Sequence, residues 1–417
     1  MSKTLLDRFL TRGVKQGRLG VVFADGSDST YGEPAEGFPE IVIRFSDDRV
    51  PRDIIMDPRL GAAEAFMDGR LVIEEGDVMG LVTLLRANNA WDKGGDIGPP
   101  KLFRRVVNRA TWAAEKVNNA ISSKSNVAHH YDIGNDFYAL MLDPEHWQYS
   151  CAYWPEGVET LGDAQTAKLA HIAAKLALKP GQNVLDIGCG WGGMAIFLAK
   201  HYDVEVTGIT LSEEQIDLAK KRVKDAGVND RVSIELVDYR DFAAAGRKFD
   251  RIVSVGMFEH VGQPQFEDFF QACANLLTDD GTMLLHTIGR MGSPGSTDAF
   301  TRKYIFPGGY IPALSETVEA SEKFRLIATD VETLRLHYGK TLRCWYDNCM
   351  ANKQAMTDMY DERFFRMWTF YLAGAATVFE YGSMCNYQIQ YARSRHALPI
   401  TRGYIETEEK RLLKNSG

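Results

Sequence analysis

The sequence predicts an α/β protein in which a doubly wound, nucleotide-binding sheet follows a small α+β domain. One observation is a strand–turn–helix unit: Asn183–Ile187 has the composition of a short buried strand, Gly188–Gly193 supplies turn residues, and Met194–Lys200 has the apolar face of a helix. Such a unit opens these sheets, because glycine permits a positive φ and lets a ligand approach the bare backbone. The other observation is that strand-like segments recur after it, with helical segments between them.

The composition excludes several functional classes. The 417 residues allow two or three domains, and the formal net charge of −8, with no basic block among aromatic residues, argues against nucleic-acid binding. The first residues lack the apolar centre of a signal peptide, and the longest apolar run, Met367–Phe379, is shorter than the roughly 18–20 residues of a spanning helix. The six cysteines form no C-x-x-C pairs, which predicts reduced thiols, no metal site and a cytoplasmic protein.

Residues 1–95 are predicted to form the small α+β domain. Its segments with the periodicity of helices or strands are Leu5–Leu10, Leu19–Phe23, Ile41–Phe45, Pro58–Asp68 and Gly76–Asn88. In Leu19–Phe23 and Ile41–Phe45 the residues alternate as in strands, and the other three segments have the apolar spacing of helices. No catalytic constellation appears here, so a lipid-docking or dimer-forming domain is expected.

Residues 96–125 are predicted to join this domain to the next. Gly94–Pro100 has the glycine and proline content of a linker, and Lys101–Val117 has the pattern of a basic amphipathic helix. The basic residues of that helix are Lys101, Arg104, Arg105 and Arg109. Such a helix either docks on an anionic membrane surface or packs its apolar side on the core while its charges stay in solvent.

The glycine-rich turn carries the strongest functional signal. Leu-Asp-Ile-Gly-Cys-Gly-Trp-Gly, residues 185–192, departs from the G-x-G-x-x-G pattern and resembles motif I of the S-adenosylmethionine (SAM) methyltransferases. The resemblance implies that Asp186, Gly188 and Gly190 bind the cofactor. The alternative is an NAD-type dinucleotide turn, but no later residues supply hydride chemistry.

Two segments before the turn extend the resemblance to a family. Val127–Tyr138 contains His-His-Tyr-Asp, and Trp147–Trp154 contains Tyr-Ser-Cys-Ala-Tyr. With motif I they resemble the cyclopropane fatty acid synthase family, which includes the mycolic acid cyclopropane synthases. The likeness runs from about residue 126 to the C-terminus and is looser over the first hundred residues. It implies that residues 126–417 form a class I SAM-methyltransferase domain with helical acyl-binding additions.

Further strands place the remaining cofactor residues. The predicted strands are Val204–Ile209, Val232–Val237, Phe249–Gly256 and Gly281–Gly289. The resemblance implies that SAM is also bound by Tyr131, Ser150, Thr210, Leu211, Gln215, Asp238 and Tyr239. Many SAM enzymes use an acidic residue for the ribose hydroxyls; here Gln215 takes that place, since an amide both donates and accepts hydrogen bonds.

Glu259 and His286 stand at the ends of the last two predicted strands, facing the cofactor turn. An alkene that attacks the SAM methyl group becomes a carbocation, so ring closure needs a proton acceptor and a site without water. The resemblance implies that a bicarbonate ion is this base and is held by Cys151, Glu259, His286, Tyr338 and the backbone of Ile288. The alternative for Cys151 is a small buried apolar residue.

Two later features concern the lipid. Residues 289–312 form a long glycine- and proline-containing loop, which resembles the family's substrate-covering insertion. Phe364–Leu372 with Val378 and Phe379 presents a wide aromatic face, which is either core or, by resemblance, the lining of an acyl-chain tunnel.

The resemblance implies a complete activity. SAM would provide a methylene group for the cis double bond of unsaturated acyl chains in membrane phospholipids, and the product would be a cyclopropane ring. The protein would be a homodimer on the inner face of the plasma membrane. The alternatives are an alkene C-methyltransferase that closes no ring, a small-molecule N-methyltransferase, and a non-enzymatic lipid- or SAM-binding protein.

Overall fold

The computed structural model describes residues 2–95 and 133–414; the predicted basic helix at 101–117 and Tyr131 lie outside them. The described residues form two compact units, and each unit is assembled from separate stretches of the chain. The first unit contains residues 2–95, 296–307 and 339–384, and the second contains residues 133–295, 308–338 and 385–414. The predicted division into 1–95, 96–125 and 126–417 stays a prediction.

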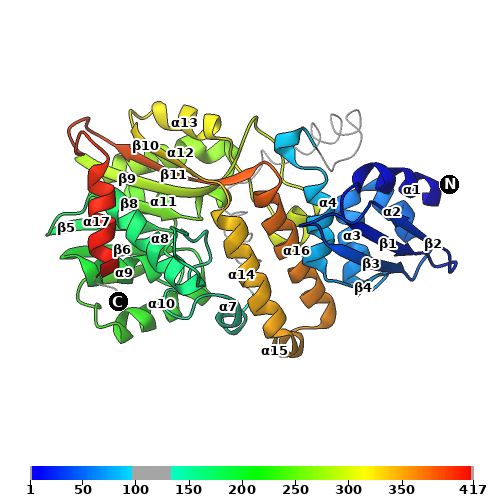
Figure 1. The fold of residues 1–417 in the computed structure, drawn as a ribbon. Coiled ribbons are helices and arrows are strands. Elements are labelled where there is room, and N and C mark those ends of the chain that lie inside the picture. Colours follow the sequence, from blue (N-terminus) through cyan, green and yellow to red (C-terminus); the bar gives the residue numbers. More distant parts are fainter. Residues whose placement is uncertain (1, 96–132, 415–417) are drawn as a thin grey trace. The chain divides into compact units, whose positions relative to one another are not determined.

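The second unit is built on a seven-stranded sheet in the order β10-β11-β9-β8-β5-β6-β7 (Figure 1). Its strands are β5 (Gln182–Ile187), β6 (Val204–Thr210), β7 (Val232–Leu236), β8 (Phe249–Val255), β9 (Leu277–Arg290), β10 (Ile327–Leu334) and β11 (Met384–Ala392). β7, β6, β5, β8 and β9 pair in parallel, whereas β10 and β11 pair antiparallel. The chain order reverses between β5 and β8, which is where doubly wound sheets bind ligands. The predicted α/β fold is confirmed.

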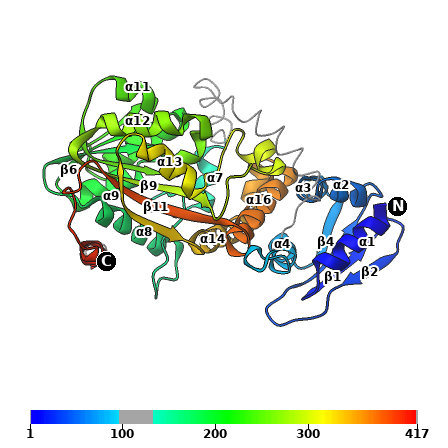
Figure 2. The ribbon, with the colours of Figure 1, turned by 90° about the horizontal axis from the view of Figure 1, so that it is seen from above.

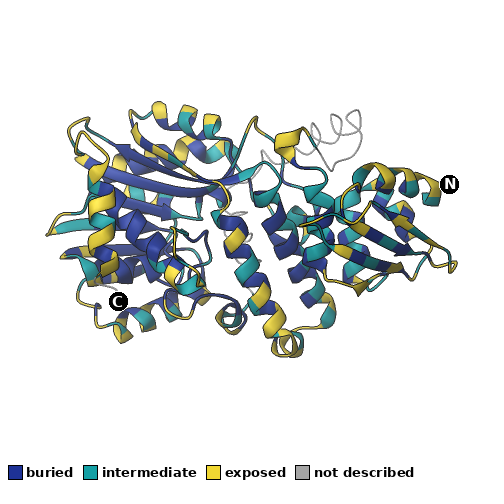
Figure 3. Cartoon of the chain, in the orientation of Figure 1, coloured by how far each residue is buried: buried dark blue, intermediate teal, exposed yellow. Residues whose placement is uncertain are grey.

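Helices cover both faces of this sheet (Figure 2). One face packs against α8 (Leu161–Leu176), α9 (Gly193–His201), α10 (Glu213–Asp225) and α17 (Gly403–Lys414). The other face packs against α11 (Tyr239–Ala244), α12 (Phe266–Leu276) and α13 (Leu314–Glu322). A short helix, α7 (Asn135–Met141), precedes α8. The central strands are therefore buried on both sides, as the continuous dark blue in Figure 3 shows.

The last strands of the sheet were not predicted. β11 carries Asn386, Gln388 and Gln390, which alternate along the strand as solvent-facing residues normally do. All three are at most 2% exposed, because they face the sheet side that α8 covers and meet polar groups there. The predicted loop 289–312 is also shorter than expected, since β9 continues to Arg290 and a helical turn forms at Thr301–Ile305.

The first unit contains a four-stranded sheet in the order β2-β1-β3-β4. The strands are β1 (Arg18–Val22), β2 (Asp28–Tyr31), β3 (Glu40–Phe45) and β4 (Leu71–Glu75), and the helices are α1 (Ser2–Gly13), α2 (Val50–Met56), α3 (Pro58–Met67) and α4 (Val78–Ala87). All five segments predicted in this region form elements of the predicted type. A short 3₁₀ turn at Trp91–Lys93 ends the region.

Helices from late in the sequence complete the first unit. They are α14 (His337–Ala351), whose first two residues belong to the second unit, α15 (Lys353–Met359) and α16 (Glu362–Glu380). α16 packs along α3 and α4, and the Trp91 amide donates to the Tyr381 carbonyl at 2.8 Å. Trp368 of the predicted aromatic face is 1% exposed, so part of that face is core. Among residues 2–95 and 133–414, no helix is long and apolar enough to cross a membrane.

Candidate active site

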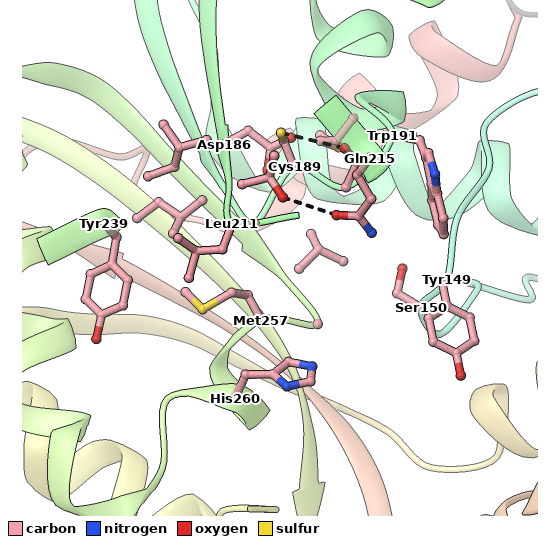
Figure 4. A pocket seen from close by; sticks show the side chains of 18 of the residues that line it. Tyr149, Ser150, Asp186, Cys189, Trp191, Leu211, Gln215, Tyr239, Met257 and His260 are labelled. Carbon is pink, nitrogen blue, oxygen red and sulfur yellow. Dashed lines mark hydrogen bonds between the residues drawn. The ribbon is translucent and has the colours of Figure 1, made fainter. Parts of the chain in front are cut away.

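A pocket opens at the carboxyl ends of β5, β6, β7 and β8 in the second unit (Figure 4). The predicted cofactor residues that line it are Ser150, Asp186, Gly188, Gly190, Thr210, Leu211, Gln215, Asp238 and Tyr239. Figure 4 shows Ser150 and Tyr239 on opposite sides of the pocket, with Gln215 on the side of Ser150. Nine of the ten predicted cofactor residues therefore share one cavity, and the tenth, Tyr131, is outside the described residues.

The glycine turn leaves the base of this pocket open. Gly188, Gly190 and Gly192 have φ values of +81°, +54° and +77°, in the left-handed region that favours glycine. The amides of Gly188 and Cys189 donate to the Ile209 carbonyl at 2.9 and 3.0 Å, which ties the turn to β6. Of the described residues, only Gln215 would lie within 4 Å of a Cβ atom on Gly190, and Gly190 lines the cavity, so the added atom would project into it.

Asp186 offers an acceptor at the end of β5. Its side chain is buried, and one carboxylate oxygen has no hydrogen-bond partner within the described ranges 2–95 and 133–414. Burial raises the pKa of the group to about 7. An unpaired buried acceptor is costly in a folded protein, and a ligand that donates an N–H removes the cost.

Gln215 is held by the start of α10. Ser212 caps the helix by accepting from the Gln215 amide at 3.2 Å, and Thr210 Oγ1 donates to Gln215 Oε1 at 3.1 Å. These bonds fix the side chain inside the pocket. The predicted contact with ribose hydroxyls is compatible with this position.

Asp238 has a partner that the sequence interpretation did not include. Its carboxylate accepts from Arg240 Nε at 2.8 Å and Arg240 Nη2 at 2.6 Å. Burial acts to raise the pKa of Asp238, but these hydrogen bonds outweigh it and lower the pKa below its ordinary value. The Asp238 carboxylate is therefore ionised and paired with Arg240, and a ligand amino group that binds it would have to donate to the same oxygens.

The predicted catalytic residues lie on segments that converge beside the pocket. The Gly256 amide donates to the His286 carbonyl at 2.9 Å, so the ends of β8 and β9 are adjacent. A Cβ atom on Gly256 would lie 3.7 Å from Ser150, next to Cys151. The Trp154 amide donates to His337 Nδ1 at 2.8 Å, which brings the segment of Tyr338 to the segment of Cys151.

Glu259 lies in a 3₁₀ turn, Phe258–His260, that follows β8. Its Oε1 accepts from the Ile288 amide at 2.6 Å, and its buried Oε2 has no hydrogen-bond partner among the residues that the structure describes. Burial raises the pKa of Glu259 to about 7, against the opposing effect of the Ile288 hydrogen bond. With this pKa the carboxyl group is present in both forms near neutral pH, so its unpartnered oxygen can donate to a bound bicarbonate ion or accept from the O–H of that ion, whereas an amide nitrogen at the same place could only donate.

His286 is fully buried on β9. Its Nε2 lies 3.1 Å from the Asn386 amide nitrogen and its Nδ1 lies 3.2 Å from the Gln388 amide nitrogen. Burial, with the charges of Lys168 and Lys175, lowers the pKa well below its ordinary value, so the ring is neutral. A neutral ring has one donor and one acceptor nitrogen, and one of the two amides must therefore present its oxygen.

Cys151 and Tyr338 are both buried. The Cys151 thiol donates to the Ala152 carbonyl at 3.3 Å, and burial raises its pKa far above the ordinary value. A thiol with a raised pKa stays protonated and is a poor nucleophile. The hydrogen-bonding role expected for Cys151 stays a prediction.

Several residues of the pocket were not singled out from the sequence. They include Trp147, Gln148, Tyr149, Cys189, Trp191, Met257 and His260. Trp147 has a φ of +54°, and the Asp143 carboxylate holds this strained turn by accepting from the amides of residues 146, 147 and 148. Burial lowers the pKa of His260 to about 4, so it lines the pocket as a neutral ring. Its position next to Glu259 was the only signal for it in the sequence.

Comparison with known proteins agrees with this geometry. The family model of mycolic acid cyclopropane synthetase matches residues 118–389. Cyclopropane-fatty-acyl-phospholipid synthase of Escherichia coli K12 is 37% identical over 357 residues, which cover 84% of this chain and 87% of the relative. A probable fatty acid methyltransferase of Pseudomonas putida is 39% identical over 349 residues, 81% of this chain and 84% of that relative.

A solved structure shares the fold over about two thirds of the chain. The mycolic acid cyclopropane synthase CmaA1, complexed with SAH and CTAB, superimposes with a TM-score of 0.61 and 35% identity, covering 64% of this chain and 98% of that one. Cyclopropane mycolic acid synthase 1 of Mycobacterium tuberculosis is 37% identical over 271 residues, 62% of this chain and 93% of the relative.

Proposed function

The chain belongs to the mycolic acid cyclopropane synthetase family of SAM-dependent methyltransferases, and from this premise we propose that it converts the cis double bond of unsaturated phospholipid acyl chains into a cyclopropane ring. The observation that carries the proposal is Glu259. It is a buried carboxyl group with a free oxygen and a raised pKa, beside a pocket suited to SAM. Ring closure must remove a proton from a C–H bond, whereas methyl transfer to an oxygen or nitrogen acceptor releases a more acidic O–H or N–H proton.

The extent of the similarity favours a phospholipid substrate. The match to the E. coli phospholipid synthase covers 84% of this chain, whereas the match to the mycolate enzyme covers 62%. The additional length lies largely before the family match, which begins at residue 118. We assign that N-terminal region to lipid docking, on the inner face of the plasma membrane, and to homodimer formation.

The reaction makes two carbon–carbon bonds. The alkene electrons attack the SAM methyl carbon as the S–CH₃ bond breaks, and sulfur keeps the electron pair of that bond in S-adenosylhomocysteine. The acyl chain then carries a carbocation next to the new methyl group. Loss of a proton from this methyl group releases the C–H electrons, which close the ring.

The residues around Glu259 serve the proton loss. Bound bicarbonate would supply the proton acceptor. Glu259, Cys151 and Tyr338 would orient it by hydrogen bonds, and neutral His286 adds no positive charge that would oppose the carbocation. The Ile288 amide holds Glu259 in place. Burial of these groups excludes water, which would otherwise trap the cation.

A second candidate is methylation of the acyl chain without ring closure; the Pseudomonas putida relative is described only as a probable fatty acid methyltransferase. The two activities differ in the fate of the carbocation. Purified protein should therefore be incubated with SAM and vesicles of unsaturated phospholipid, and the lipids should be examined by mass spectrometry and NMR. Both products gain one CH₂, and NMR signals of ring protons are expected. A methyl or methylene branch would instead establish the second candidate.

A further inference from the structure

α8 presents a polar face to the interior of the second unit. Its inward residues are Gln165, Lys168, His171 and Lys175, whose spacing places them on one side of the helix. Gln165, Lys168 and Lys175 are 0% exposed and His171 is 5% exposed. Buried polar residues normally serve a specific partner, because an unpaired one is destabilising.

The partners of the first two residues form a wall of the pocket. Lys168 donates to Gln148 Oε1 and, at 2.9 Å, to Ser150 Oγ. Gln165 donates to the carbonyl oxygens of Ser150 at 3.1 Å and of Gln148 at 3.4 Å. Trp147, Gln148, Tyr149 and Ser150 all line the cavity. Two adjacent turns of α8 therefore hold one continuous segment of that wall.

The same segment is confined on its other side by α9. A Cβ atom on Gly193 would lie 2.2 Å from the His146 carbonyl oxygen and 2.4 Å from Gln148 Nε2, so only glycine allows the segment to lie this close to the helix. Gln148 itself donates to the His146 carbonyl at 3.1 Å. The wall has little freedom to move while these contacts persist.

Lys168 is a buried basic residue whose hydrogen-bond acceptors are uncharged. Within the described parts of the chain, no carboxylate is in ion-pair distance of it, and its two acceptors are an amide and a hydroxyl. The nearby charges are those of Asp143, which holds the turn before the wall, and Asp186 in the pocket. Burial lowers the pKa of Lys168 to about 7. A buried ammonium group without a carboxylate partner destabilises the folded protein, so its presence beside the pocket calls for a functional reason.

We propose that Gln165 and Lys168 are positioning residues for SAM, which hold the Gln148–Ser150 wall in the conformation that binds it. This inference rests on the proposed function only for the identity of the ligand. Neither residue contacts the reacting atoms; they act through the wall. Lys175 lies two turns further along the same helix, pairs with Glu332 and Asp330, and does not line the pocket, so it is a matched control.

The test measures SAM affinity by calorimetry in K168M, Q165M and K175M, with folding checked by circular dichroism and thermal unfolding. Hydrogen bonds from charged groups predict about 10- to 100-fold weaker SAM binding in K168M and about 3- to 10-fold weaker binding in Q165M. K175M should lose stability, because it breaks a buried ion pair, yet bind SAM within about twofold of wild type. K168R, which keeps the charge and the donors, should bind SAM more tightly than K168M.

Three results would overturn the proposal: SAM affinity within twofold of wild type in both K168M and Q165M, equal weakening in K168R and K168M, or equal weakening in K175M. If K168M does not fold, Q165M decides, because a neutral-to-neutral replacement costs less stability. In active variants, the loss should appear in KM for SAM more than in kcat. Wild type that binds SAM but does not modify lipid would refute the proposed function and leave this inference standing.

Discussion

Replacing Glu259 with glutamine tests the site of proton loss while keeping the hydrogen bond from the Ile288 amide. Glu259 Oε1 accepts from the Ile288 amide at 2.6 Å, and a glutamine carbonyl oxygen can accept the same hydrogen bond. The other oxygen has no partner to lose. Glutamine has nearly the same shape and carries no charge, so E259Q should fold and bind SAM with nearly native affinity.

The effect on turnover should be large and the effect on stability should depend on pH. General base catalysis is worth about 10²–10⁴-fold, and a loss of that size in kcat is expected. The pKa of Glu259 rises from 4.5 to about 7 on folding, a shift equivalent to about 3 kcal/mol. Because the folded state holds this proton more tightly than the unfolded state, the stabilisation is complete below about pH 4.5 and is lost as the pH rises through about 7.

Two measurements check this reasoning. Chemical denaturation at about pH 5 and about pH 8 should show wild type losing on the order of 2–3 kcal/mol more unfolding free energy than E259Q over that interval. Turnover should be measured in degassed buffer with and without added bicarbonate, which should accelerate wild type and barely affect E259Q. Full activity of E259Q without bicarbonate would refute the assignment, and parallel pH–stability curves would refute the raised pKa.

Three other substitutions test the remaining parts of the site and its surroundings. Gly190→Val should abolish SAM binding, because the valine side chain would enter the cavity and the φ of +54° disfavours a branched residue. Near-native SAM affinity in a folded variant, measured by calorimetry, would show that SAM does not bind against Gly190. Cys151→Ser should retain part of the activity, since a hydroxyl still donates a hydrogen bond, and complete loss of turnover in the folded variant would point to a covalent role. Replacing Arg104, Arg105 and Arg109 together with glutamine should weaken binding to anionic vesicles and its salt dependence. Unchanged co-sedimentation with such vesicles would favour the linker interpretation of that segment.

The parallel core of the sheet and the location of the pocket were predictable from the sequence. Buried strands are rich in apolar and β-branched residues, as Val204–Ile209 and Phe249–Gly256 are, and ligands bind where parallel strands end. β11 was not predictable in this way, because Gln388 and its neighbours face a polar layer inside the protein. Alternation of polar and apolar residues shows that the two faces of a strand differ in polarity, but it does not show which face meets solvent.

Side-chain partners account for most of what the sequence could not provide. Asn386 contacts His286 across 100 positions of the chain, and no local pattern relates them. Lys168 resembles any basic residue of a surface helix until its burial is known. Asp238 had a plausible ligand-binding role, but the arginine two positions later already occupies its carboxylate. Burial and pairing are properties of the tertiary structure, and they decide the charge of each of these groups.

The cover that α16 provides for α3 and α4 has a consequence for biosynthesis. α4 ends at Ala87 and α16 begins at Glu362, a separation of 275 positions (362 − 87). At about 5–20 residues per second, a ribosome needs roughly 14–55 s to synthesise the intervening chain. During that time the nascent N-terminal region exposes the apolar surface of α3 and α4 on which α16 packs in the folded protein, so it is a candidate client for chaperones. For the same reason, residues 1–95 expressed alone should aggregate, and adding a separate peptide of residues 339–384 should restore their solubility.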